Sequence, residues 1–162
     1  MEPDAIENVE EEEIENVIEL EEIERVEEED LEDEEEDEDE LSDEEFSSEE
    51  RVRMMATAAD SLRADSIVAL DLRELTIIAD FFLICTGNSS IQIRAIADRI
   101  EERLREQGLH KLRMEGYQEA TWILLDYGDL VAHVMAAEQR AFYNLEAFWA
   151  QAPRLELELK PE

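Results

Sequence analysis

Apolar residues at helical spacing predict that the folded part of the chain begins with a helix just after residue 47. Ser47 and Glu50 stand three residues apart, as in a capping box, where each side chain bonds the backbone amide of the other residue. The apolar stripe that follows consists of Val52, Met55, Ala56, Ala59 and Leu62. Two β-type runs come next, SIVALDL over 66–72 and the more apolar FFLICTG over 81–87.

A longer helix is predicted after the second of these runs. Ser89 and Gln92 repeat the capping-box spacing at its start. Gly108 suits its end, because glycine readily adopts the left-handed conformation found just past helix ends. The predicted core stripe of this helix is Ile93, Ile96, Ala97, Ile100 and Leu104. After it, KLRMEG over 111–116 predicts a short strand.

The remaining pattern predicts two strands and a last helix. The β-rich runs cover 122–126 and 129–135, and the helix covers 138–149. Apolar residues at helical spacing in that helix are Phe142, Leu145, Phe148 and Trp149.

The predicted order is therefore α, β, β, α, β, β, β, α. A strand, a long helix and a further strand imply a right-handed crossover and at least one parallel pair of strands. The last two strands are close enough in sequence to be antiparallel. We therefore expect an α/β domain, with a mixed β-sheet flanked by helices.

Charge divides the chain into two parts. Residues 1–50 hold 30 of the 48 Asp and Glu side chains and one of the 14 Lys and Arg, a net charge of −29. Such a segment has little apolar surface to bury and many repelling charges. We expect residues 1–46 to be an acidic, low-complexity, disordered tail. A folded domain over 47–153 and a short C-terminal tail over 154–162 complete the expected organisation.

Composition also limits the classes of protein. No run of about 18 apolar residues exists, so we expect no membrane span. The N-terminus lacks the basic and apolar regions of a signal peptide, so we expect a cytoplasmic protein. Cys85 is the one cysteine, which excludes an intrachain disulfide and a cysteine-based zinc site.

The stretch ATWILLDYGDLVAHVM over 120–135 places Asp126, Asp129 and His133 close together in sequence. Two carboxylates and an imidazole can form a metal site or an acid–base pair. Tyr127-Gly128 reads as a two-residue hairpin turn, with glycine supplying the positive φ. The expected pairs are then Asp126 with Asp129, Leu124 with Val131, and Trp122 with His133.

In that arrangement the carboxylates stand at the turn and the imidazole is roughly 13 Å along the strand, at about 3.3 Å per residue. Aspartates at a turn commonly bond turn amides, so we expect no metal site here. Both faces of the hairpin are apolar, and one of them must be covered by more helix or by another molecule. Trp122 then reads as an anchor for a partner or as an ordinary core residue.

Three longer stretches are the most specific in the folded part. They are DFFLICTGNSS over 80–90, WILLDYGD over 122–129 and R-x-F-Y-x-L-E-x-F-W over 140–149. Together they resemble the ribosomal silencing factor family, also called Iojap-like proteins, with a match running from about residue 51 to 153. The acidic tail has no place in this family pattern.

The resemblance implies a function that composition does not give. Members of the family bind the large ribosomal subunit through the ribosomal protein numbered fourteen, at the face that meets the small subunit. They block joining of the subunits and repress translation under nutrient limitation. The implied fold resembles the nucleotidyltransferase fold without its catalytic equipment, and no cofactor is implied.

An enzyme is the alternative. Gly87-Asn88-Ser89-Ser90 before a helix resembles the Gly-Ser segment of nucleotidyltransferases acting on a nucleotide or RNA end, and a helix N-terminus can bind phosphate. Those enzymes hold Mg²⁺ on a closely spaced carboxylate pair on a following strand. Here the next predicted strand offers only Glu115, and Asp126 and Asp129 lie on opposite arms of a hairpin.

We therefore interpret the hairpin as a docking element. The predicted contacts to the ribosomal protein are Trp122, Leu124, Asp126, Val131, His133 and Met135. Asp126 is expected to meet Lys or Arg, because ribosomal proteins are generally basic. Free copies are also expected to form a homodimer through the same apolar face, as the family resemblance implies. We expect no sequence-specific contact with nucleic acid.

Overall fold

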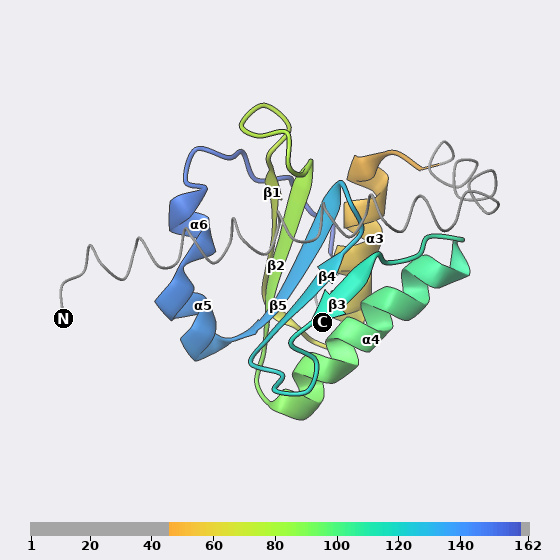
Figure 1. Cartoon of the computed structure of the whole chain (residues 1–162), viewed down its shortest axis with the longest axis vertical. Helices are drawn as coiled ribbons and strands as arrows, with labels where there is room; N and C mark the ends of the chain where they lie inside the picture. Colours follow the sequence, from red (N-terminus) through yellow and green to blue (C-terminus); the bar gives the residue numbers. More distant parts are fainter. Residues whose placement is uncertain (1–45, 160–162) are drawn as a thin grey trace.

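The computed structural model describes residues 46–159, and it confirms the predicted order of elements except that the last helix is split. The elements, labelled as in Figure 1, are α3 (Ser48–Ser61), β1 (Asp65–Asp71), β2 (Phe81–Gly87), α4 (Ser90–Glu106), β3 (Arg113–Glu115), β4 (Trp122–Asp126), β5 (Leu130–Ala136), α5 (Ala137–Tyr143) and α6 (Leu145–Phe148). The acidic tail predicted for 1–46 lies outside the described residues, apart from Phe46. Within this described part, no helix is long and apolar enough to cross a membrane.

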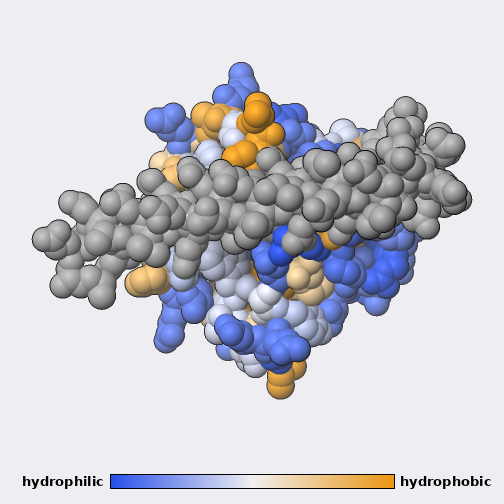
Figure 2. All heavy atoms as spheres, viewed as in Figure 1, coloured by the Kyte–Doolittle hydropathy of each residue, from blue (hydrophilic) through white to orange (hydrophobic). Residues whose placement is uncertain are grey.

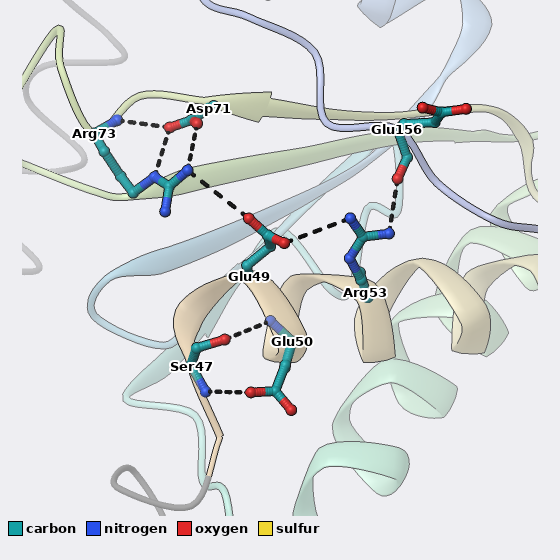
Figure 3. Close-up of polar contacts among 7 residues, drawn as sticks. All are labelled: Ser47, Glu49, Glu50, Arg53, Asp71, Arg73 and Glu156. Carbon is teal, nitrogen blue, oxygen red and sulfur yellow. Dashed lines mark hydrogen bonds and ion pairs between the residues drawn. The ribbon is translucent and has the colours of Figure 1, made fainter.

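Both long helices begin at the predicted caps. The Glu50 amide donates to Ser47 Oγ at 3.1 Å and the Ser47 amide donates to Glu50 Oε1 at 3.2 Å, which completes a capping box (Figure 3). At α4 the Gln92 amide donates to Ser89 Oγ at 3.1 Å. The Gln92 side chain, however, accepts from the amide of Asn88, at 2.6 Å, so the second box differs from the expected one by one residue.

The five strands form one mixed sheet in the order β1-β2-β5-β4-β3. β2 and β5 are parallel, and the three other neighbouring pairs are antiparallel. The predicted parallel pair and the predicted antiparallel final pair are both confirmed. The connection from β2 to β5 runs through α4, β3 and β4, so a long crossover joins these two neighbouring strands.

Helices cover both faces of the sheet, as Figure 1 shows: α3 and α4 lie on one side, α5 and α6 on the other. Alternate residues of β2 enter the two cores. Phe81, Leu83 and Cys85 pack with the stripes of α3 and α4, whereas Phe82 and Ile84 pack on the α5–α6 side. This double coverage explains why FFLICTG is almost wholly apolar, with Thr86 as its polar side chain and all seven residues of β2 buried.

The continuous last helix expected over 138–149 is wrong, because the chain breaks at Asn144. This residue has φ 49° and ψ 55°, the left-handed conformation, and it separates α5 from α6. Asparagine tolerates that conformation better than most residues with a side chain. The break changes which residues of this segment are buried. Helix α5 buries none of its residues, and α6 buries only Leu145.

The chain after α6 runs along the outer edge of β1. The Asp71 amide donates to the carbonyl of Pro153 at 2.8 Å, and the Leu155 amide donates to the carbonyl of Ala69 at 2.9 Å. Leu155, Leu157 and Leu159 pack against the core on the α3–α4 side. The segment therefore covers part of an otherwise unpaired sheet edge.

Charged side chains connect this segment to α3 and β1 (Figure 3). Arg53 donates to the carbonyl of Glu156 at 2.7 Å, and Glu49 lies 3.5 Å from Arg53 and 3.9 Å from Arg73. Arg73 in turn pairs with Asp71 at 2.7 Å. Because the side chains of Glu49, Arg53 and Arg73 are more than a third exposed, each pair among them adds at most about 1 kcal/mol to the free energy of unfolding.

Candidate functional site

The hairpin of β4 and β5 turns one residue later than expected. The Tyr127 amide donates to the carbonyl of Leu130 at 2.8 Å, so Tyr127 still belongs to the ladder and Gly128-Asp129 forms the turn. Gly128 has φ 90°, and its amide donates to Asp126 Oδ1 at 2.7 Å. The Asp126 carboxylate thus organises the start of the turn, as expected from the sequence for an aspartate at this position.

The later turn shifts the expected pairing by two residues. The observed partners are Asp126 with Val131, Leu124 with His133, and Trp122 with Met135, so the predicted register is wrong. Because side chains alternate with a period of two, an even shift leaves each residue on its predicted face. All six predicted contact residues are therefore on one face of the sheet, the face covered by α5 and α6.

The two aspartates serve the structure of the turn. Asp126 is fully buried. Asp129 makes a two-bond ion pair with Arg51 of α3, at 2.9 Å for Oδ1 and 2.5 Å for Oδ2. The backbone carbonyl of Asp129 also accepts from the amides of Asp80 and Phe81. Arg51 stands 78 residues from Asp129 in sequence, so no local pattern predicted this pair.

His133 is a buried, neutral side chain. It is 2% exposed, and its Nδ1 accepts a hydrogen bond from Trp122 Nε1 at 3.0 Å. Its ring meets Phe82 edge-on, with centroids 4.6 Å apart. Burial lowers the pKa of His133 to about 3, so the ring carries no charge near neutral pH. Within residues 46–159, no group of three or more His, Cys, Asp or Glu is placed to hold a metal ion.

Exposure separates Trp122 from the five other predicted contact residues. Trp122 is partly exposed at the start of β4. The others lie in the core between the sheet and the α5–α6 segment, with exposed fractions of 5% or less: Leu124, Asp126, Val131, His133 and Met135. As the chain is folded here, Trp122 is the predicted contact residue that a partner can touch directly.

Two further aromatic residues extend the surface around Trp122. The Tyr143 ring lies 4.9 Å from the Trp122 ring, and the Phe142 ring lies 5.0 Å from Tyr143. Phe142 is 54% exposed. We call Trp122, Phe142 and Tyr143 the aromatic surface. The sequence pattern missed it because it grouped Phe142 with Leu145, Phe148 and Trp149 at the spacing of one continuous helix.

Trp122 is placed by the loop that precedes β4. Gly116 has φ 80°, and a Cβ there would lie 2.1 Å from the Trp122 carbonyl oxygen. The Ala120 amide donates to the Gly116 carbonyl at 2.9 Å, which closes the loop. Arg94 of α4 donates to the carbonyl of Tyr117 at 2.9 Å and also to that of Gln118. Helix α4 therefore fixes a loop that presents Trp122 on the opposite face of the sheet.

A second exposed apolar feature lies elsewhere. Figure 2 shows apolar atoms gathered over the loop between β1 and β2. In this loop Leu75 is 40% exposed and Ile77 is 102% exposed. The loop adjoins the end of the sheet where Phe81 pairs with Leu130, whereas the Trp122–Met135 pair stands at the other end. It is therefore separate from the aromatic surface.

The residues that resemble a nucleotidyltransferase site have structural roles here. Ser89 caps α4, and a Cβ added at Gly87 would lie 2.7 Å from Ile93 Cγ1, so glycine is needed for packing. Glu115 pairs with Arg113 at 2.7 Å. Asp126 is fully buried and Asp129 pairs with Arg51, so these two residues do not present a carboxylate pair to the Gly87–Ser90 loop.

Comparison with known proteins gives a consistent result. Residues 45–162 match the family described as "Ribosomal silencing factor during starvation". A ribosomal silencing factor of Halalkalibacterium halodurans is 46% identical over 112 residues, covering 69% of this chain and 96% of the relative. One of Bacillus subtilis is 44% identical over 107 residues, covering 66% and 91%. A crystal structure from Bacillus halodurans, 42% identical, has a TM-score of 0.61 and covers 68% of this chain and all of that one.

Proposed function

The chain belongs to the ribosomal silencing factor family, and on this premise we propose that it binds the large ribosomal subunit and prevents its joining to the small subunit. The family consists of regulators of translation that are not enzymes. The partner we propose is the ribosomal protein numbered fourteen, at the face that meets the small subunit. The consequence is repression of translation under nutrient limitation.

The observation that carries the docking site is the aromatic surface. Aromatic residues with one exposed side dominate the energetics of protein interfaces, because they bury a large area with few rotatable bonds. Trp122 is partly exposed beside Tyr143, and Phe142 is more than half exposed. We assign direct contact with the ribosomal protein to these three residues.

The other predicted contact residues act from beneath this surface. Leu124, Val131 and Met135 form the apolar base on which the α5–α6 segment rests. His133 orients Trp122 through the bond from Nε1 to Nδ1. Asp126 contributes by shaping the turn rather than by meeting a basic residue of the partner, since it is fully buried.

The proposed mechanism is occupancy. A protein bound at the subunit interface excludes the small subunit by its bulk, so inhibition requires one copy per large subunit and no nucleotide. Such a protein must meet ribosomal subunits, so we infer a cytoplasmic location. We infer no cofactor and no sequence-specific contact with nucleic acid, because the proposed contact is between two proteins.

Free copies are proposed to associate through the same aromatic surface. An exposed apolar surface that has no partner favours self-association. Dimer formation and ribosome binding would then compete for Trp122, Phe142 and Tyr143. Sedimentation equilibrium of the full chain should show a dimer that dissociates in the Phe142→Ala variant, and an unchanged dimer in that variant would place the contact elsewhere.

A subunit-joining experiment tests the proposed function. Purified protein is added to isolated large subunits before small subunits, and joined ribosomes are measured by sucrose-gradient sedimentation. The intact chain should reduce joining in proportion to its amount, with saturation near one copy per large subunit. Normal joining at saturating protein would refute the proposal.

Two matched variants locate the contact. Phe142→Ala removes an exposed ring of the aromatic surface, and Ile91→Ala removes a side chain that is 77% exposed at the start of α4. Phe142→Ala should weaken inhibition of joining by about 2 kcal/mol of binding free energy, the scale of an interface hot spot. Ile91→Ala should inhibit as the parent chain does. Equal effects of both variants would reject the aromatic surface as the docking site.

A further inference from the structure

The guanidinium of Arg140 connects α5 to three other elements. Nε and Nη2 donate to the two carboxylate oxygens of Glu146 in α6, at 2.8 and 3.1 Å. Nη1 donates to the carbonyl of Ser66 in β1 at 2.7 Å and to Thr86 Oγ1 in β2 at 3.0 Å. The side chain is only 12% exposed. One side chain therefore bonds both α6 and the two strands beside it.

These bonds add to the limited packing of α5, in which the partly buried Tyr143 lies against Trp122 and the neighbouring core. None of its seven residues is buried, and Ala136 at its N-terminus provides no side-chain cap. Helix α6 likewise has no side-chain capping bond, since the Asn144 side chain makes none, and of its four residues one, Leu145, is buried. Helices this short have no stability of their own and depend on tertiary contacts.

The strand end that receives Arg140 is also irregular. Ser66 has φ 50°, and the pairing of β1 with β2 shifts between Asp65 and Val68, as at a β-bulge. A bulge removes backbone groups from the ladder and leaves them available for other partners. The Ser66 carbonyl is such a group, and Arg140 is its partner.

Helix α5 carries two of the three residues of the aromatic surface. Phe142 and Tyr143 follow Arg140 within one helical turn, and the Tyr143 ring contacts Trp122. We propose that Arg140 is a positioning residue, which seats α5 and α6 on the sheet so that Phe142 and Tyr143 complete the docking surface with Trp122. This role in docking rests on the proposed function.

Only an arginine can make this set of bonds. Its planar fork directs donors to a carboxylate on one side and to the two strands on the other, whereas a lysine has one ammonium group on a flexible stem. Arg140→Lys therefore keeps the charge and loses the geometry. Arg154→Lys is the matched control, because Arg154 lies 3.5 Å from the same Glu146 carboxylate and is 62% exposed.

Two measurements on the full chain test the role. Hydrogen exchange is followed at the amides of Asn144, Phe148 and Trp149, which bond carbonyls within the α5–α6 segment, with the Phe81 amide in the sheet as reference. Binding to isolated large subunits is measured on the same proteins. Arg140→Lys should speed exchange in the segment but not at Phe81, and should weaken binding by about tenfold. Glu146→Gln should act in the same direction, and Arg154→Lys should change neither quantity.

The outcomes distinguish this inference from the proposed function. Unchanged exchange in Arg140→Lys overturns the positioning role, as does faster exchange with unchanged binding. Faster exchange at Phe81 as well would make Arg140 a residue of general stability and would also overturn it. If the protein without any substitution does not bind large subunits, the proposed function fails. Faster exchange of Arg140→Lys confined to the α5–α6 segment would still show that Arg140 holds α5 and α6 on the sheet.

Discussion

At the scale of single residues, Gly116 is the position where a side chain is least tolerable. Its φ is 80°, and an added Cβ would overlap the Trp122 carbonyl oxygen at 2.1 Å. We expect Gly116→Ala to lower the free energy of unfolding by at least about 2 kcal/mol, from backbone strain and the displaced carbonyl. Urea denaturation measures this loss.

Gly108→Ala provides the control for that prediction. Gly108 also has φ 80°, so its substitution carries the conformational cost of the left-handed region. The excess loss in Gly116→Ala over Gly108→Ala reports the overlap with the Trp122 carbonyl. Equal losses in the two variants would show that the loop adjusts without strain.

His133 predicts a pH dependence of stability. Its pKa is about 3 in the folded protein because burial disfavours the charged ring, and near 6.5 when the chain unfolds. The unfolded state therefore binds a proton first, so stability is complete above pH 6.5 and falls as pH decreases toward 3. At pH 5 the loss should be about 2 kcal/mol relative to pH 7, at 1.36 kcal/mol per pH unit.

His133→Gln isolates this contribution, since glutamine does not titrate. Urea denaturation between pH 5 and 7 should show a smaller pH dependence in the variant than in the parent chain. Both proteins carry the same carboxylates, so the difference between their pH dependences reports His133. Identical slopes for the two proteins would mean that the His133 ring is accessible to protons in the folded state.

At the scale of elements, the sequence predicted what local patterns encode. Capping residues such as Ser47 and Ser89 mark helix starts, and the core stripe of α4 is buried as expected. The register of the hairpin was missed because turns at Tyr127-Gly128 and at Gly128-Asp129 both fit the same alternation of apolar residues. Contacts between distant segments, such as Arg51 with Asp129 and Arg140 with Ser66, have no local signature at all.

In the candidate site, too, local sequence patterns predicted some features, whereas features set by contacts between distant segments were missed. The faces of β4 and β5 followed from the alternation of apolar residues, which placed Trp122 on the same face as Leu124 and Val131, but the pattern did not indicate which helices cover that face. Which residues on that face remain accessible was not predictable, because it depends on how α5 and α6 pack. The left-handed Asn144 decides that packing, and the helical spacing of the aromatic residues on either side of it gave no sign of a break.

Asn144 accordingly offers a test of the two-helix arrangement. Its φ of 49° suits Asn and Gly and disfavours other residues. Asn144→Gly should change the free energy of unfolding by less than about 0.5 kcal/mol, whereas Asn144→Ala should lower it by about 1 kcal/mol. Urea denaturation gives both values. A more stable Asn144→Ala variant would favour a continuous helix over 138–149.

At the scale of the whole molecule, the acidic tail dominates the charge. Residues 1–50 carry a net −29, and the ribosome is mostly polyanionic RNA. Net charge acts on the rate of encounter without any specific contact. We therefore expect removal of residues 1–45 to raise the association rate with large subunits at low salt. The cut leaves Phe46, whose carbonyl accepts from Arg51 at 3.3 Å, and the Ser47 cap intact.

Salt dependence distinguishes the roles that the tail can have. The gain in rate should shrink as salt rises, because the Debye length falls from about 30 Å at 0.01 M to about 8 Å at physiological ionic strength. Stopped-flow association of the two proteins measures it. Slower association after truncation would instead indicate that the tail tethers the protein to basic extensions of ribosomal proteins. Equal association rates of the full and truncated proteins at every salt concentration would mean that the tail affects solubility and not binding.

The most direct test of the central claim is sedimentation of the purified full chain with ribosomal particles. The protein is incubated in parallel with isolated large subunits, isolated small subunits and joined ribosomes, and bound protein is measured in each peak of a sucrose gradient. Docking at the subunit interface predicts about one copy per large subunit, and none on small subunits or on joined ribosomes, where that face is covered. Equal binding to large subunits and joined ribosomes, or no binding to large subunits, would contradict it.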